Sequence, residues 1–142
     1  MTTIDSIIEL FEKEFSPIME KFKVIKLLSD NSDEKRVLES EEIRKIKLDH
    51  VHNPGVYVFY GNGSPYRVGR HLTNTRKRVM QHYNENTGNE NFNIRQLNDF
   101  EDREVILFNL IDLKDMHWAA ALEIFLEDRL KRDLKIPAKR QG

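Results

Sequence analysis

A tyrosine, a group of cations, a histidine and a glutamate are the residues of this chain whose types and spacing suit chemistry on a phosphodiester. Tyr57 lies in an apolar run, and a segment rich in arginine and lysine follows it. From Tyr66 to His82 the chain carries five Arg or Lys residues and no acidic residue. A local cationic patch attracts a polyanion even though the net charge of the whole chain is only -1. The sequence therefore predicts a polyanionic partner such as a nucleic acid.

A tight hairpin followed by a basic helix is expected to position these side chains. Residues 56–60 and 65–70 are rich in valine and tyrosine, which favour strands. Gly61-Asn62-Gly63 between them predicts a hairpin turn, because glycine accepts the positive backbone angles that such turns need. Thr73 or Asn74 is expected to cap a helix that runs to residue 84.

The spacing of apolar residues predicts the remaining elements. In the N-terminal part we expect a helix over 4–22 that Pro17 kinks or divides, a strand or a continuation of the helix at 24–28, and a charged helix over 35–48. After the hairpin and the basic helix we expect a short helix at 94–100, a strand at 104–111 and a helix over 116–134. This order predicts an α+β fold, with a small three-stranded, mainly antiparallel sheet flanked by helices. Residues 1–50 are expected to form an additional helical N-terminal extension packed on or beside the core.

Composition bounds the class of protein. The chain has 142 residues and 39% hydrophobic content, enough for one hydrophobic core. It has no cysteine, which excludes a disulfide framework and a cysteine-ligated metal site. Polar and acidic residues follow Met1, and no long apolar run is present, so a cytoplasmic protein with no membrane partner is expected. The sequence does not determine the oligomeric state, and a homo-oligomer is one possibility.

The ordered set of motifs resembles the GIY-YIG nuclease superfamily. Gly55-Val56-Tyr57 is followed, after nine residues, by Arg67-Val68-Gly69. An arginine helix ending in Arg78-Val79-Met80-Gln81-His82, a third strand and a helix that carries Glu123 come next, in the family's order. The resemblance implies that residues 51–142 form a nuclease domain, and that this domain hydrolyses DNA phosphodiester bonds with the help of a divalent metal ion.

The same resemblance implies that Glu123 is the metal ligand, for Mg²⁺ or Mn²⁺. On a helix its neighbours three and four positions away include Ala119, Ala120 and Leu126, and a carboxylate among apolar side chains is costly unless it is paired or metal-bound. Magnesium suits a site with few protein oxygens, because water and phosphate complete its shell. An acid on a solvated helix edge, or one paired with a sheet arginine, is the alternative that stays open.

Catalytic roles for Tyr57, Arg78 and His82 are implied in the same way. Arg78 would grip the scissile phosphate, and His82, one helical turn further, would assist. Tyr57 would lie near the attacking water and handle its proton. A phenol titrates at about 10, so this role needs nearby cations such as Arg67 and Arg70. A surface cation, a surface histidine and a half-buried strand tyrosine are the plainer interpretations of the three residues.

Four further cations are predicted to bind nucleic acid. Arg70 follows the second motif glycine, where the family often has a phosphate contact, and Arg76 and Lys77 suit positioning contacts to the backbone. Arg67 stands where the second motif should present a tyrosine, and Tyr66 is one position away. One position reverses the face of a strand, so without a bulge Tyr66 should point away from the site and Arg67 into it.

Two other functions remain as alternatives. The family often has an asparagine just beyond the last helix, and no asparagine follows Pro137 in this chain. This absence and the arginine at position 67 favour a catalytically impaired nucleic-acid-binding module on the same fold. An intracellular protein-interaction domain would instead use the N-terminal helices as its working surface.

Overall fold

The fold is α+β, as predicted: an N-terminal helix and a four-stranded antiparallel sheet that packs against a C-terminal helix. The computed structural model describes residues 2–30, 37–38, 45–71 and 94–136. Its helices and strands, with 3₁₀ helices written η, are α1 (Ile4–Glu14), η1 (Met19–Lys21), β1 (Phe22–Lys26), β2 (Gly55–Gly61), β3 (Ser64–His71), η2 (Ile94–Asp99), β4 (Glu104–Leu110), η3 (Leu113–Asp115) and α4 (Met116–Leu130).

The sheet has one strand more than predicted. Its order is β1-β4-β2-β3, and every neighbouring pair is antiparallel. The segment that the sequence left open between strand and helix forms β1, in which Phe22 pairs with Leu110 of β4. The first helix ends at Glu14, before Pro17, and so frees this segment to extend. The two edges of the sheet are β1 and β3.

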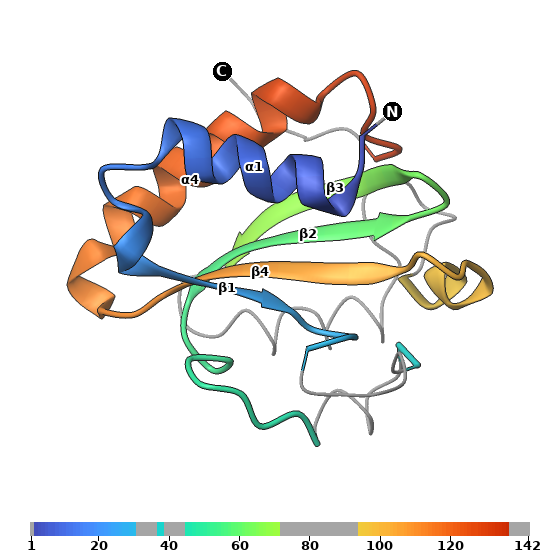
Figure 1. The fold of residues 1–142 in the computed structure, drawn as a ribbon, viewed down its shortest axis with the longest axis horizontal. Helices are drawn as coiled ribbons and strands as arrows, with labels where there is room; N and C mark the ends of the chain where they lie inside the picture. The colour runs from blue at the N-terminus through green and yellow to red at the C-terminus, as the bar shows by residue number, and fades with distance from the viewer. Residues whose placement is uncertain (1, 31–36, 39–44, 72–93, 137–142) are drawn as a thin grey trace.

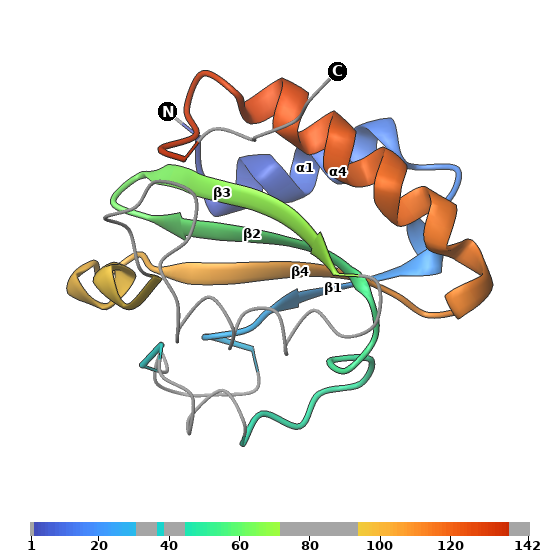
Figure 2. The same ribbon diagram turned by 180° about the vertical axis from the view of Figure 1, so that it is seen from behind.

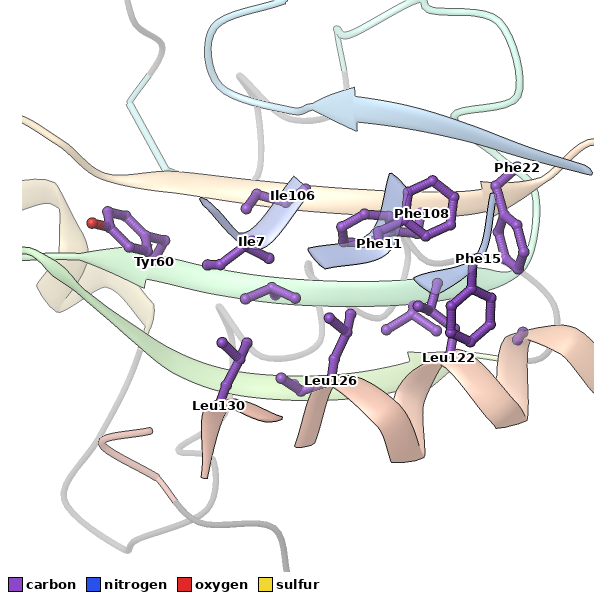
Figure 3. Packing of buried hydrophobic residues seen from close by; sticks show 14 of the residues in the cluster. Ile7, Phe11, Phe15, Phe22, Tyr60, Ile106, Phe108, Leu122, Leu126 and Leu130 are labelled. Carbon is purple, nitrogen blue, oxygen red and sulfur yellow. The ribbon is translucent and has the colours of Figure 1, made fainter. Parts of the chain in front are cut away.

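Helices α1 and α4 lie side by side over one face of the sheet (Figures 1 and 2). A capping box between Thr3 and Ser6 begins α1, because each side chain accepts a hydrogen bond from the backbone of the other. Ile7 and Phe11 on this helix are buried against the sheet. Figure 3 shows how α1, the sheet and α4 share one cluster, which includes Phe108, Leu122, Leu126 and Leu130. An interaction surface on α1 is therefore limited to its exposed polar side.

The other face of the sheet carries a second hydrophobic cluster, centred on Tyr57 and Phe59. Their rings lie 5.0 Å apart, centroid to centroid, and neither residue is more than 1% exposed. Segments from several connections cover them, and these contribute Leu27, Leu28, Leu38, Ile46, Val51, Ile94, Leu97 and Ile136. Because successive strand residues face opposite sides, Val56 and Val58 belong to the helix face and Tyr57 to this one.

The turn between β2 and β3 is the predicted tight hairpin. Asn62 and Gly63 both have positive φ, at 51° and 73°, as a two-residue primed turn requires. The carboxylate of Asp102 accepts hydrogen bonds from both of their backbone NH groups, each at 2.7 Å. The side chain therefore fixes the turn that sets the register between β2 and β3.

Glu104 is expected to contribute strongly to stability through the buried hydrogen bonds that its carboxylate accepts. It is 1% exposed, and one carboxylate oxygen accepts from the backbone NH of Leu28 at 2.7 Å while the other accepts from the Ser29 hydroxyl. Glu104→Ala leaves the buried backbone NH of Leu28 and the Ser29 hydroxyl without their acceptor, so we expect a loss of about 2 kcal/mol in the free energy of unfolding. Urea denaturation measures it, with exposed Glu101→Ala as control; equal stability of the two variants would contradict the assignment.

Two predicted helices, over 35–48 and 73–84, lie wholly or largely outside the described residues. The short helix expected at 94–100 is the 3₁₀ helix η2, and the last helix ends at Leu130 rather than at Leu134. Within the part of the chain that the structure describes, no helix is both long enough and apolar enough to cross a bilayer.

Candidate functional site at the edge strand β3

The phenol of Tyr57 crosses onto the neighbouring strand β3. Tyr57 pairs with Gly69 across the β2–β3 ladder. A Cβ atom added at Gly69 would lie 2.2 Å from the hydroxyl oxygen of Tyr57 and 2.2 Å from its Cζ atom. No other residue type leaves room for the ring there. Gly69 therefore allows the phenol to reach the edge strand of the sheet.

Glu123 reaches the same strand from α4. The Oε1 atom of its carboxylate lies 3.7 Å from Nε of Arg70, and the Glu123 side chain is 12% exposed. Arg70 pairs with Val56, which packs under the helices, so it stands on the helix face of β3. Pairing with a sheet arginine is the alternative to metal ligation that the sequence left open, and it is the arrangement seen here.

Tyr57 and Glu123 thus approach β3 from opposite faces of the sheet, although the roles that the resemblance implies place both residues in one site. Period-two alternation is the reason, because Gly69 and Arg70 are consecutive residues and face opposite ways. β3 is an edge strand, however, and both groups lie beside neighbouring residues of it. A ligand that contacts both must meet the sheet along this edge.

A β-bulge in β3 sets the orientation of the second motif. Phe59 pairs with Arg67 and Tyr60 pairs with Pro65, so Tyr66 is an extra residue without a ladder partner. Tyr66 packs against the hydrophobic cluster that contains Tyr57. The expectation that Tyr66 points away from that face applied to a strand without a bulge, and the bulge present here re-aims the side chains around it.

The Tyr66 phenol is poorly suited to accept a proton. Its burial, and then the negative charge of Asp102, raise the pKa of the Tyr66 hydroxyl above its ordinary value. Its ring lies 6.4 Å from that of Phe100, centroid to centroid. Tyr66 therefore packs against Phe100 and the cluster around Tyr57 in this structure.

Arg67 carries a buried donor that lacks a hydrogen bond. Its Nε atom is inaccessible to solvent and has no hydrogen-bond partner among the described residues. The guanidinium shares a face with Phe59, its cross-strand partner, and therefore with Tyr57. No carboxylate in the described ranges forms an ion pair with Arg67, in contrast to Arg70.

His71 is a residue on the Tyr57 face that the sequence reasoning missed. It closes β3 and pairs with Gly55, the first residue of β2. Alternation along the strand places it on the same side as Gly69, where the Tyr57 phenol lies. The predicted strand stopped at Arg70, so this histidine was left outside it. Period-two alternation, counted on from Gly69, was the signal that could have found it.

The remaining predicted site residues, Arg76, Lys77, Arg78 and His82, lie outside the described residues. Their roles stay predictions. The structure brings together Tyr57 with Gly69 and Glu123 with Arg70, both at one end of β3.

The donor set around Glu123 is compatible with one divalent ion of low protein coordination. The described parts of the chain contain no group of three or more histidine, cysteine or acidic residues that could hold a metal ion. Magnesium is often bound through one or two carboxylates, with water and substrate phosphate as its other ligands. Glu123 can supply one carboxylate, which would then contact both the metal ion and the Arg70 guanidinium.

A hollow at the opposite end of the sheet is unsuited to a polyanion. It has a volume of about 480 Å³ and is lined by Asp5, Asp102 and Glu104 together with Lys26. Three carboxylates against one ammonium group repel phosphate. The Arg67–His71 part of β3, which contains two arginines and a histidine, is the part that suits an anionic ligand.

Comparison of the chain with protein-family models, with curated proteins and with solved structures finds no match in any of the three.

Proposed function

We propose that this protein is a divalent-metal-dependent endonuclease that hydrolyses DNA phosphodiester bonds at the edge strand β3. The observation that supports it best is the placement of the Tyr57 phenol and the Glu123 carboxylate beside the consecutive residues Gly69 and Arg70. The order of motifs, which resembles GIY-YIG nucleases, adds to this support.

Each candidate site residue has a definite task in this proposal. Tyr57 handles the proton of the water that attacks the phosphorus in line with the leaving oxygen. Glu123 would hold Mg²⁺, and the ion would supply positive charge to polarise the phosphate and to offset the charge that develops on it. Arg67 supplies positive potential on the Tyr57 face of β3, Arg70 positions the Glu123 carboxylate, and Arg78 on the predicted basic helix adds a phosphate contact. The short segment from Arg67 to Arg70 therefore organises the reaction.

Nicking of supercoiled plasmid tests the proposal. The wild type is incubated with Mg²⁺, with Mn²⁺ and with EDTA, beside Glu123→Ala and Arg78→Ala. We expect the wild type to convert the plasmid to open circles only when metal is present, and we expect both substitutions to abolish this conversion. Lack of nicking by a folded wild type under every metal condition would overturn the enzymatic proposal.

A non-catalytic nucleic-acid-binding module is the second candidate. The ion pair between Arg70 and Glu123 favours it, because a carboxylate neutralised by an arginine needs no metal ion. A gel-shift assay with plasmid or short duplex DNA separates the two candidates. A shifted band without cleavage in either metal identifies the binder, and cleavage identifies the enzyme.

Removing the charge of Arg70 is expected to change the metal requirement. The guanidinium and a metal ion compete for the same carboxylate, because Nε lies 3.7 Å from Oε1. Arg70→Gln should therefore lower the Mg²⁺ concentration for half-maximal nicking several-fold, while the maximal rate falls. A metal titration of nicking rates measures both quantities, and an unchanged midpoint would show that Glu123 does not hold the ion.

A further inference from the structure

We infer that β3 divides its two arginines between two tasks: Arg67 binds the substrate phosphate, and Arg70 acts only through Glu123 as a positioning residue. This inference rests on the proposed function, and it revises the expectation that both arginines contact the nucleic-acid backbone. It follows from the different surroundings of the two guanidinium groups.

The buried Nε–H of Arg67 is the first argument. An unsatisfied donor inside a protein costs stability, and native structures keep few of them. In the described parts of the chain no group accepts from this Nε atom. The other two guanidinium nitrogens of Arg67 are not among these buried atoms, so an anion that arrives from outside can bind to them and offset this cost.

The contrast with Arg70 is the second argument. Arg70 already has an anionic partner, the Glu123 carboxylate, at 3.7 Å. A phosphate would have to compete with that carboxylate for Arg70, whereas Arg67 forms no ion pair with any described acid. The free charge for an incoming phosphate is therefore on Arg67.

The position of Arg67 relative to Tyr57 is the third argument. Arg67 and Gly69 are two residues apart on one face of β3, which places their Cα atoms about 7 Å apart. The Tyr57 hydroxyl lies over Gly69. A guanidinium at the end of an arginine side chain spans such a distance, and its planar fork matches two phosphate oxygens. Arg67 and the phenol can therefore address the same phosphate.

DNA affinity without catalysis tests this division. Binding of a short fluorescent duplex is followed by anisotropy in EDTA, at several salt concentrations, for wild type, Arg67→Met, Arg67→Lys and Arg70→Gln. We expect Arg67→Met to weaken binding about tenfold and to reduce the slope of log K against log salt by about one. Arg67→Lys should restore the slope and only part of the affinity. Arg70→Gln should change neither by more than about twofold.

Thermal unfolding provides a readout that needs no DNA. Methionine is close to arginine in length and has no donor to bury, so Arg67→Met should leave Tm unchanged or raise it by a few degrees. Arg129→Gln, an exposed arginine on α4 that pairs with Glu14, is the control for loss of one positive charge. It should leave the affinity close to wild type.

The outcomes separate this inference from the proposed function. Cleavage by the wild type, combined with normal affinity and slope for Arg67→Met, overturns the division of tasks and leaves the nuclease intact. A salt slope that Arg70→Gln reduces and Arg67→Met does not would reverse the assignment. A wild type that neither binds nor cuts DNA overturns both.

Discussion

Glu123→Gln is expected to reduce metal-dependent nicking of plasmid DNA by at least about 100-fold, because it removes the charge that holds the ion while keeping the shape of the side chain. The carboxylate of Glu123 is the acidic group that the described structure places beside Arg70. Initial rates at saturating Mg²⁺ measure the effect.

The control for this substitution lies on the same helix. Asp128 is exposed on α4 and pairs with Lys131 at 3.6 Å, so Asp128→Asn removes one negative charge of the helix away from β3. Its nicking rate should stay within about twofold of wild type. Stability should change little in either variant, because Arg70 is about one-third exposed and its ion pair is screened by water. Equal rates for Glu123→Gln and wild type would remove Glu123 from the mechanism.

Gly69→Ala is expected to destabilise the fold and to displace the Tyr57 phenol. The added Cβ would lie 2.2 Å from both Cζ and the hydroxyl oxygen of Tyr57, and the ring is buried, so it has no space into which to retreat. Overpacking of this kind costs about 1–3 kcal/mol in the free energy of unfolding. Urea denaturation measures the loss, and the nicking rate should fall with it.

A double-mutant cycle shows whether the clash is the cause. In the background Tyr57→Leu the phenol is absent, so Gly69→Ala should cost only a few tenths of a kcal/mol. Strong non-additivity between the two substitutions is therefore the expected result. Simple additivity would mean that the phenol does not lie over Gly69.

The edge-strand geometry also explains why the two motif tyrosine positions differ in this chain. Tyr57 reaches β3 because Gly69 has no side chain, and Arg67 shares its face through the ladder partner Phe59. Tyr66 fills the bulge and, partly buried, packs against the same cluster as Tyr57, with the pKa of its hydroxyl raised. The residue at the second motif position on this face is therefore an arginine rather than a tyrosine.

Local signals made the hairpin predictable from sequence. The Gly-Asn-Gly turn needs positive φ, and the valine-rich and tyrosine-rich runs beside it favour extended chain, so β2 and β3 follow from short-range preferences. The last strand and the last helix were predicted from the spacing of their apolar residues. β1 stayed ambiguous, because a five-residue apolar segment becomes a strand only when a partner such as β4 pairs with it.

The sequence by itself determined which side chains are available at β3 and that an α+β fold would carry them. Only the tertiary structure decided which of those side chains lie on each of the two faces of the sheet. The bulge at Tyr66 comes from the register with β2, and the pairing of Arg70 with Glu123 joins residues that are distant in the chain. Neither is visible in local preferences, because both arise from contacts that form only when the strand, its neighbour and the last helix pack together.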